Sequence, residues 1–185
     1  MHLLCGLGNK GSEYTFTRHN IGYLVIDRFS ERFKIPLKKK DSGCRTGLKD
    51  DLVLAKPDTY MNLSGGPVGK LVGKFSVPPG SIIIIHDDLD MDFGKMKIRL
   101  GGRDGGHKGV RSIIESLGTQ DFYRLKIGIG RNPAMPAEEY VLSRFEYERQ
   151  QELAEVIDVA CEALDVFVRE GGSKAMSIYN KRGPE

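Results

Sequence analysis

The stretch SIIIIHDDLD, residues 81–90, decides the fold class of this chain. Four consecutive isoleucines, introduced by PPGS, predict a short strand that other elements cover on both faces. The strand ends in four ionisable side chains, His86, Asp87, Asp88 and Asp90. In open α/β sheets, ligand sites form just beyond the carboxyl ends of central strands. We therefore expect an α/β protein with its functional site at this acidic tip; the alternative is a solvated loop.

The composition fits one soluble globular domain spanning residues 1–185. Hydrophobic residues make up 39% and charged residues 29%, which are ordinary fractions. The formal net charge of +3 permits a polyanionic partner without requiring one. Three widely spaced cysteines without a CxxC pair favour a reducing compartment. Without a signal peptide or an apolar run of membrane length, the expected location is the cytoplasm.

The predicted first strand, residues 2–6, leads into the loop GLGNKG at residues 6–11. Its glycines match the G-x-G-x-x-G pattern of dinucleotide-binding proteins. That pattern requires a helix to open at once, whereas residues 12–18 form a polar loop. The glycines therefore favour a tight loop that carries Asn9.

A helical period begins only at Ile21, with Asn20 as its predicted cap. His19 then lies at the amino end of this helix, where the dipole favours a neutral imidazole. A general base has to be neutral, so His19 is a candidate base. The alternative is an ordinary surface position.

A second loop, PDTYMNLSG at residues 57–65, mixes large apolar groups with an amide. Tyr60 and Met61 are suited to be core anchors. A helical spacing of apolar residues begins at Val68. We therefore expect Asn62 to present its amide close to the start of a core-facing helix.

Two later segments, residues 95–100 and 124–129, alternate between basic and apolar residues. A period of two places the apolar side chains in the core and the basic ones on the opposite face. The expected core residues are Met96, Ile98, Leu100, Leu125, Ile127 and Ile129. If the strands pair, one cationic surface contains Lys95, Lys97, Arg99, Arg124 and Lys126. Its uniform sign favours a phosphate or nucleic-acid partner over an ordinary solvated face.

The loop between these strands, GGRDGGHKG at residues 101–109, is rich in glycine, which lets backbone amides approach a ligand. It is not a nucleotide-binding P-loop, because His107 stands where lysine is needed. Residues 88–99 resemble a calcium loop, but the glycine falls one place late and Arg99 replaces the required Glu. His86 and Asp87 are residue types that bind metals, but no second histidine follows them at the helical spacing of a metal site. We therefore expect neither a metal nor a cofactor.

These stretches, taken in order, resemble the bacterial-type peptidyl-tRNA hydrolase family over essentially the whole chain. The matching segments are GLGN at 6–9, Glu13-Tyr14, TRHNIG at 17–22, TYMNLSG at 59–65, HDDLD at 86–90, GGRDGGHKG at 101–109 and FYRLKIGIG at 122–130. The resemblance implies a single α/β domain with a mixed twisted β-sheet flanked by helices, including C-terminal helices. It also implies hydrolysis of the ester between a peptide and the 3′ ribose of tRNA.

The resemblance also implies roles for individual residues. His19 matches the general base and Asp87 its carboxylate partner. The matching substrate-binding positions are Asn9, Tyr14, Met61, Asn62 and Lys108. Arg99 and Lys126 match the basic pair that clamps the 5′ phosphate of tRNA. The implied partner is tRNA, and the chain is expected to be a monomer that does not bind membranes.

The chain departs from the family pattern at Lys108, where asparagine is usual. An amide donates and accepts hydrogen bonds, whereas an ammonium only donates. We expect activity to persist with altered efficiency. Milder departures are Lys10 for proline, Asp88 for glutamate, and Lys126 for arginine, which keeps the charge but loses the bidentate geometry.

Two alternatives remain open. One is an RNA-binding protein that lost hydrolysis, which only Lys108 favours and which the intact His19 and Asp87 oppose. The other is a nucleotide-dependent oxidoreductase built on the glycine pattern of residues 6–11, which the missing helix makes weak.

Overall fold

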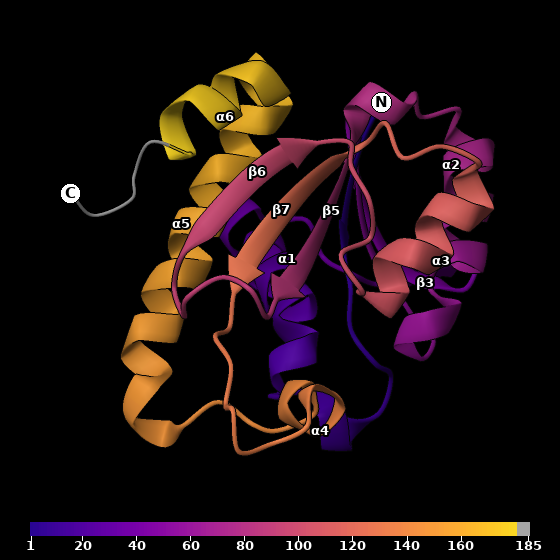
Figure 1. Cartoon of the computed structure of the whole chain (residues 1–185). Coiled ribbons are helices and arrows are strands. Elements are labelled where there is room, and N and C mark those ends of the chain that lie inside the picture. The colour runs from indigo at the N-terminus through magenta and orange to yellow at the C-terminus, as the bar shows by residue number, and fades with distance from the viewer. Residues whose placement is uncertain (181–185) are drawn as a thin grey trace.

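The computed structural model describes residues 1–180 and has one seven-stranded mixed sheet at its centre (Figure 1). The strand order is β2-β3-β4-β1-β5-β7-β6. The strands are β1 (His2–Gly6), β2 (Lys39–Asp41), β3 (Cys44–Lys49), β4 (Leu52–Pro57), β5 (Ile82–Asp88), β6 (Met96–Leu100) and β7 (Tyr123–Gly128). The α-helices of this part of the chain are α1 (Ile21–Phe33), α2 (Gly65–Phe75), α3 (Lys108–Leu117), α4 (Ala137–Val141), α5 (Gln150–Glu170) and α6 (Gly172–Tyr179). The predicted α/β class, mixed sheet and C-terminal helices are confirmed; the last five residues of the expected domain lie outside the described residues.

The isoleucine strand β5 lies in the middle of the sheet, parallel to β1 on one side and to β7 on the other. Its side chains alternate between two cores. Ile83 and Ile85 pack into the core beneath α1, α5 and α6, and Ile82 and Ile84 pack into the core beneath α2 and α3. Figure 1 shows these two helical layers on opposite faces of the sheet. The expected burial of this strand on both faces is therefore confirmed.

Gly22 allows α1 to start directly against the tip of β5. A Cβ atom at this position would lie 2.4 Å from the carbonyl oxygen of Ile85 and 2.5 Å from the backbone nitrogen of Leu7. Only glycine leaves room for backbone at that distance. The close approach brings the turn before α1, which carries His19, beside the acidic end of β5.

The two alternating strands do pair, and they pair antiparallel, with Lys97 opposite Lys126 and Arg99 opposite Arg124. One expected core residue is wrong: Leu100 is 48% exposed. It lies at the end of β6, which is an edge strand of the sheet. This strand has a neighbouring strand, β7, on one side only, so its end is open to solvent.

Within residues 1–180, no helix combines the length and the apolar character needed to cross a membrane.

Candidate active site

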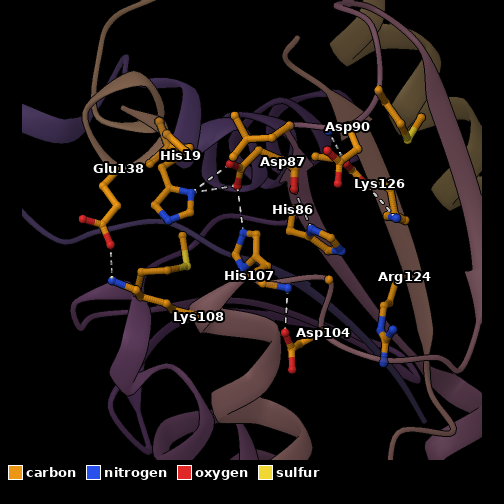
Figure 2. Close-up of a pocket in the computed structure, with 18 of the residues that line it drawn as sticks. His19, His86, Asp87, Asp90, Asp104, His107, Lys108, Arg124, Lys126 and Glu138 are labelled. Atoms are coloured by element: carbon orange, nitrogen blue, oxygen red, sulfur yellow. Dashed lines mark hydrogen bonds and ion pairs between the residues drawn. The ribbon is translucent and has the colours of Figure 1, made fainter. Parts of the chain in front are cut away.

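A cleft of about 850 Å³ opens where β5 ends, and Figure 2 shows the side chains that surround it. Its walls come from the turn η2 (Arg18–Asn20), the turn η3 (Met61–Leu63), the loop at residues 101–107 and α4. The predicted site residues that line it are Asn9, His19, Met61, Asn62, Asp87, Arg99, Lys108 and Lys126. The remaining one, Tyr14, lies in the turn η1 (Ser12–Tyr14) and is not among the lining residues.

Asp87, at the end of β5, is held between two imidazoles. Nδ1 of His19 lies 2.9 Å from both carboxylate oxygens of Asp87, and Nε2 of His107 lies 2.9 Å from Oδ1. The two imidazole centroids are 4.9 Å apart. Figure 2 shows both rings converging on this carboxylate from η2 and from the glycine-rich loop.

The partners of each ring determine its tautomer. A carboxylate can only accept hydrogen bonds, so the nitrogens that face Asp87 carry protons. The Nδ1 of His107 accepts from the backbone N–H of Val110 at 3.3 Å and so caps α3, which makes His107 a neutral Nε2–H donor. His19 donates through Nδ1, and its Nε2 has no hydrogen-bond partner among residues 1–180. His19 therefore offers the cleft a free basic nitrogen.

The carboxylate itself stays ionised. Burial alone would raise the pKa of Asp87, but attraction to His19 and His107 and their hydrogen bonds outweigh it and hold the pKa far below its usual range. Asp87 is only 3% exposed, so this charge is well shielded from water. A buried anion next to His19 stabilises the imidazolium that forms when His19 takes up a proton.

His86 is buried directly before Asp87 and holds the backbone of that residue in place. Its Nδ1–H donates to the carbonyl oxygen of Asp87 at 2.7 Å, and its ring meets that of His107 edge-on. Burial lowers the pKa of His86 well below its usual value, and the neighbouring His107 lowers it further. His86 is thus neutral and fixes the backbone of Asp87.

Asn20 occupies the N-cap position of α1, as predicted, but its side chain makes no capping hydrogen bond. Its side chain accepts from the backbone N–H of Asn9 at 2.8 Å and donates to the carbonyl of Asn9 at 2.9 Å. The Oδ1 of Asn9 in turn accepts from the backbone N–H of Met61 at 2.7 Å. This fixes the orientation of the Asn9 amide and leaves its NH₂ group free to donate into the cleft.

The cationic wall of the cleft comes from β6 and β7, and consists of Lys97, Arg99, Arg124 and Lys126. Arg99 is exposed, whereas Lys126 pairs with Asp88 at 2.5 Å. The expectation that Arg124 belongs to the exposed surface is wrong. Arg124 is 3% exposed and donates to the carbonyl oxygens of Gly102 and Arg103, so it holds the glycine-rich loop.

Lys108 faces α4 across the cleft. Its Nζ lies 3.2 Å from Oε1 of Glu138, and both side chains are largely exposed. Figure 2 shows Glu138 to the left of His19 and Lys108 below it. The ammonium of Lys108 is therefore occupied by a partner on the opposite wall.

The cluster of His19, Asp87 and His107 is close enough to hold a metal ion, since its ligand atoms lie within 4.8 Å of one another. The tautomer of His107 does not fit this use. Its Nδ1 lone pair already accepts from Val110, so Nε2 carries a proton where a metal would need a second lone pair. Metal binding would have to break the cap of α3.

A model of the peptidyl-tRNA hydrolase family matches residues 3–185. The chain belongs to the peptidyl-tRNA hydrolase family.

Curated family members cover the same length. The peptidyl-tRNA hydrolase of Thermodesulfovibrio yellowstonii is 47% identical over 186 residues, which span 98% of this chain and 100% of the relative. That of Mycoplasmopsis synoviae is 42% identical over 182 residues, spanning 98% and 97%. A crystal structure of peptidyl-tRNA hydrolase from Acinetobacter baumannii matches with a TM-score of 0.91 at 33% identity and covers 100% of this chain and 97% of that one. This peptidyl-tRNA hydrolase family member is accordingly an enzyme of the hydrolase class.

His107 is the site residue that the sequence-based prediction missed. The sequence argument used it only to reject a P-loop. The available signal was its position in a glycine-rich loop that matches the peptidyl-tRNA hydrolase family. Along the chain, only the strand β6 separates this loop from the acidic tip. Its contact with Asp87 depends on where α3 starts, which no local pattern specifies.

Proposed function

We propose that this enzyme hydrolyses the ester that joins the peptide to the 3′ ribose of tRNA in peptidyl-tRNA, with His19 as the general base. The observation that carries the proposal is the bond from Nδ1–H of His19 to Asp87, which leaves Nε2 of His19 free in the cleft. The family and the full-length relatives support peptidyl-tRNA as the substrate.

In the first step, Nε2 of His19 takes a proton from water as the water oxygen attacks the ester carbonyl. This forms a tetrahedral oxyanion and an imidazolium. Asp87 keeps Nδ1 of His19 protonated and stabilises the imidazolium charge. In the second step the bond from the carbonyl carbon to the 3′ oxygen breaks, and His19 returns the proton to that oxygen. The products are a peptide with a free carboxylate and a tRNA with a free 3′ hydroxyl.

Asparagine amides position the substrate in this scheme. The free NH₂ group of Asn9 is suited to bind the ester carbonyl, where negative charge develops in the transition state. Asn62 is exposed on η3 and can reach the peptide backbone, while the buried side chain of Met61 forms an apolar wall beside them. Tyr14 does not line the cleft, so the proposal gives it no contact with the bound peptide.

Arg99 is the main candidate for binding a tRNA phosphate, because it is exposed on the cationic wall. Lys126 assists, but its ion pair with Asp88 has to loosen before it can contribute a full charge. Lys108 stays beside the peptide end of the cleft through Glu138 and does not replace the hydrogen-bond acceptor that an asparagine would offer.

Two measurements test this proposal: the fate of the water oxygen, and the effect on the rate of removing the His19–Asp87 contact. Hydrolysis of an N-blocked aminoacyl-tRNA in ¹⁸O-labelled water should place one label in the released carboxylate and none in the 3′ hydroxyl of the tRNA. Asp87→Asn should reduce the single-turnover rate by about 10²–10⁴-fold, the usual contribution of acid–base catalysis. Label in the tRNA, or a near-normal rate for Asp87→Asn, would refute the mechanism. Tight tRNA binding without any release would indicate a binding protein instead.

A further inference from the structure

Arg18 immediately precedes His19 in η2, yet it lies behind the cleft and is not among its lining residues. It is one of the few buried charged side chains of residues 1–180, with 3% exposure. Burying a guanidinium is unfavourable unless its hydrogen bonds are made, so its partners indicate what it holds.

Those partners all belong to the segment that follows α4. Nη1 of Arg18 donates to Oγ of Ser143 at 2.7 Å and to the carbonyl oxygen of Arg144. Nη2 pairs with the carboxylate of Glu146. One planar group thus binds three residues within the four-residue segment 143–146, which the rigid fork of arginine allows and the single ammonium of lysine does not.

Aromatic rings add to this clamp. The guanidinium of Arg18 lies 4.4 Å from the ring centroid of Tyr140 and 5.5 Å from that of Phe145. These are cation–π distances, and the partly desolvated setting strengthens them. Tyr140 is in turn fixed at its other end, where its hydroxyl donates to the carbonyl of Ile129 just after β7 at 2.7 Å.

The backbones of the two segments are also joined. The N–H of Arg18 donates to the carbonyl of Ser143 at 3.0 Å, and the N–H of Phe145 donates to the carbonyl of Phe16 at 3.4 Å. Thr17 and Arg144 form an isolated antiparallel bridge. The turn that carries His19 and the segment after α4 therefore form one unit, with the Arg18 side chain at its centre.

The helix at the start of that unit is the wall that faces the substrate. Its cleft-lining residues are Ala137, Glu138 and Val141, and Leu142 lines the cleft directly after it. We propose that Arg18 is a positioning residue that fixes the distance between this α4 wall and the imidazole of His19. The inference rests on the proposed role of His19 as base, and it assigns Arg18 no contact with the substrate.

Positioning of this kind affects turnover more than tRNA affinity. A misplacement of about 1 Å at a reacting centre can lower the rate roughly 10²-fold. The hydrogen bonds and ion pair of Arg18 go to residues 143–146, none of which belongs to the cationic wall on β6 and β7, so phosphate binding should not change with the clamp. Loosening the clamp should therefore lower kcat by about 10–100-fold and change KM for tRNA substrates by less than about threefold.

Arg18→Lys is the informative variant, because it keeps the charge and loses the fork. Glu146→Gln is the matched control: Glu146 is 53% exposed, and its amide oxygen can still accept, so kcat should stay within about twofold. In a double variant that combines Ser143→Ala with Glu146→Gln, the Ser143→Ala change removes the Oγ acceptor of the clamp without touching Arg18 and should lower kcat by an intermediate factor relative to the Glu146→Gln control. All variants are assayed at least 15 °C below their own melting temperatures, so that the folded fraction is complete.

A merely structural role for Arg18 would lower the melting temperature of Arg18→Lys and leave kcat of the folded enzyme unchanged. That result would overturn the inference, and so would a rise of about 10–100-fold in KM with kcat unchanged. If Arg18→Lys does not fold, the Ser143/Glu146 double variant decides by the same split between kcat and KM. Full activity of His19→Ala would instead refute the proposed base, which is a separate outcome.

Discussion

At the scale of single residues, Asp87 shows how one carboxylate gives two histidines different tasks. His107 has both ring nitrogens occupied, one by Asp87 and one by the N–H of Val110, so it serves as a fixed donor. His19 has only Nδ1 occupied and keeps Nε2 for the cleft. The difference arises from the cap of α3 and not from the residue type. The sequence identified His19 as a candidate base but assigned no role to His107, because this cap is a contact that no local pattern specifies.

Lys108 leads to a prediction at the same scale. Lys108→Asn restores a group that accepts as well as donates, and a net hydrogen bond to water or substrate corresponds to a gain of about 2–10-fold in kcat. Glu138→Gln is the matched control, because it releases Lys108 from its partner without supplying an acceptor. Steady-state rates on an N-blocked aminoacyl-tRNA measure both. A rise in Glu138→Gln equal to that in Lys108→Asn would show that the missing acceptor is not what limits the rate.

At the scale of elements, the strands β6 and β7 form a wall whose basic residues differ in availability. Alternation predicted the two strands and the side on which the basic residues lie, and left their pairing open. It could not separate Arg99 from Arg124, which face each other across the ladder. Arg124 lies on an interior strand beneath the glycine-rich loop and is buried, whereas Arg99 lies on the edge strand and is exposed.

This difference predicts an order of effects on tRNA binding. Arg99→Ala should raise KM for a full tRNA substrate by about tenfold, as expected for a hydrogen bond to a charged group, and Lys126→Ala should raise it less because Asp88 already neutralises Lys126. Lys95→Ala is the control, since Lys95 does not line the cleft. The slope of log affinity against log salt should fall by roughly 0.7–0.9 for Arg99→Ala. Equal losses on a minimal aminoacyl ester would contradict a phosphate contact.

Other elements escaped prediction for identifiable physical reasons. The strand β3 has the sequence CRTGLK, in which Gly47 and the exposed Leu48 disrupt the alternation. The helix α4 has five residues, too few to show a helical period. Arg18 was adjacent to a candidate base, but its partners lie about 125 residues further along the chain. Local patterns therefore predicted strands and the acidic tip, and tertiary contacts supplied the clamp.

At the scale of the whole molecule, parallel strands gather distant residues at one edge of the sheet. The chain leaves β1 and β5 at the same edge, and Gly22 lets α1 begin there. The site is thus assembled by the same backbone packing that stabilises the core. Its buried groups should consequently influence the stability of the fold.

His86 makes that influence measurable. Burial holds its pKa well below the usual value, while the unfolded chain binds a proton at His86 below about pH 6.5. Because the unfolded state then binds more protons, the free energy of unfolding should fall as the pH drops below that value, by up to about 1.4 kcal/mol per pH unit. His86→Gln should flatten this dependence by one proton between pH 5 and 6.5, measured by urea unfolding. Parallel slopes for the two proteins would contradict a neutral buried His86.

In the proposed mechanism, His19 activates water without a metal. The most direct measurement is release of the peptide from an N-blocked aminoacyl-tRNA by the purified enzyme in excess EDTA, for the wild type and for His19→Ala. We expect full release by the wild type and a loss of about 10²–10⁴-fold in His19→Ala, with tRNA affinity unchanged. Release that stops with EDTA and returns with a divalent cation, or a His19→Ala variant that retains near-normal turnover, would contradict it.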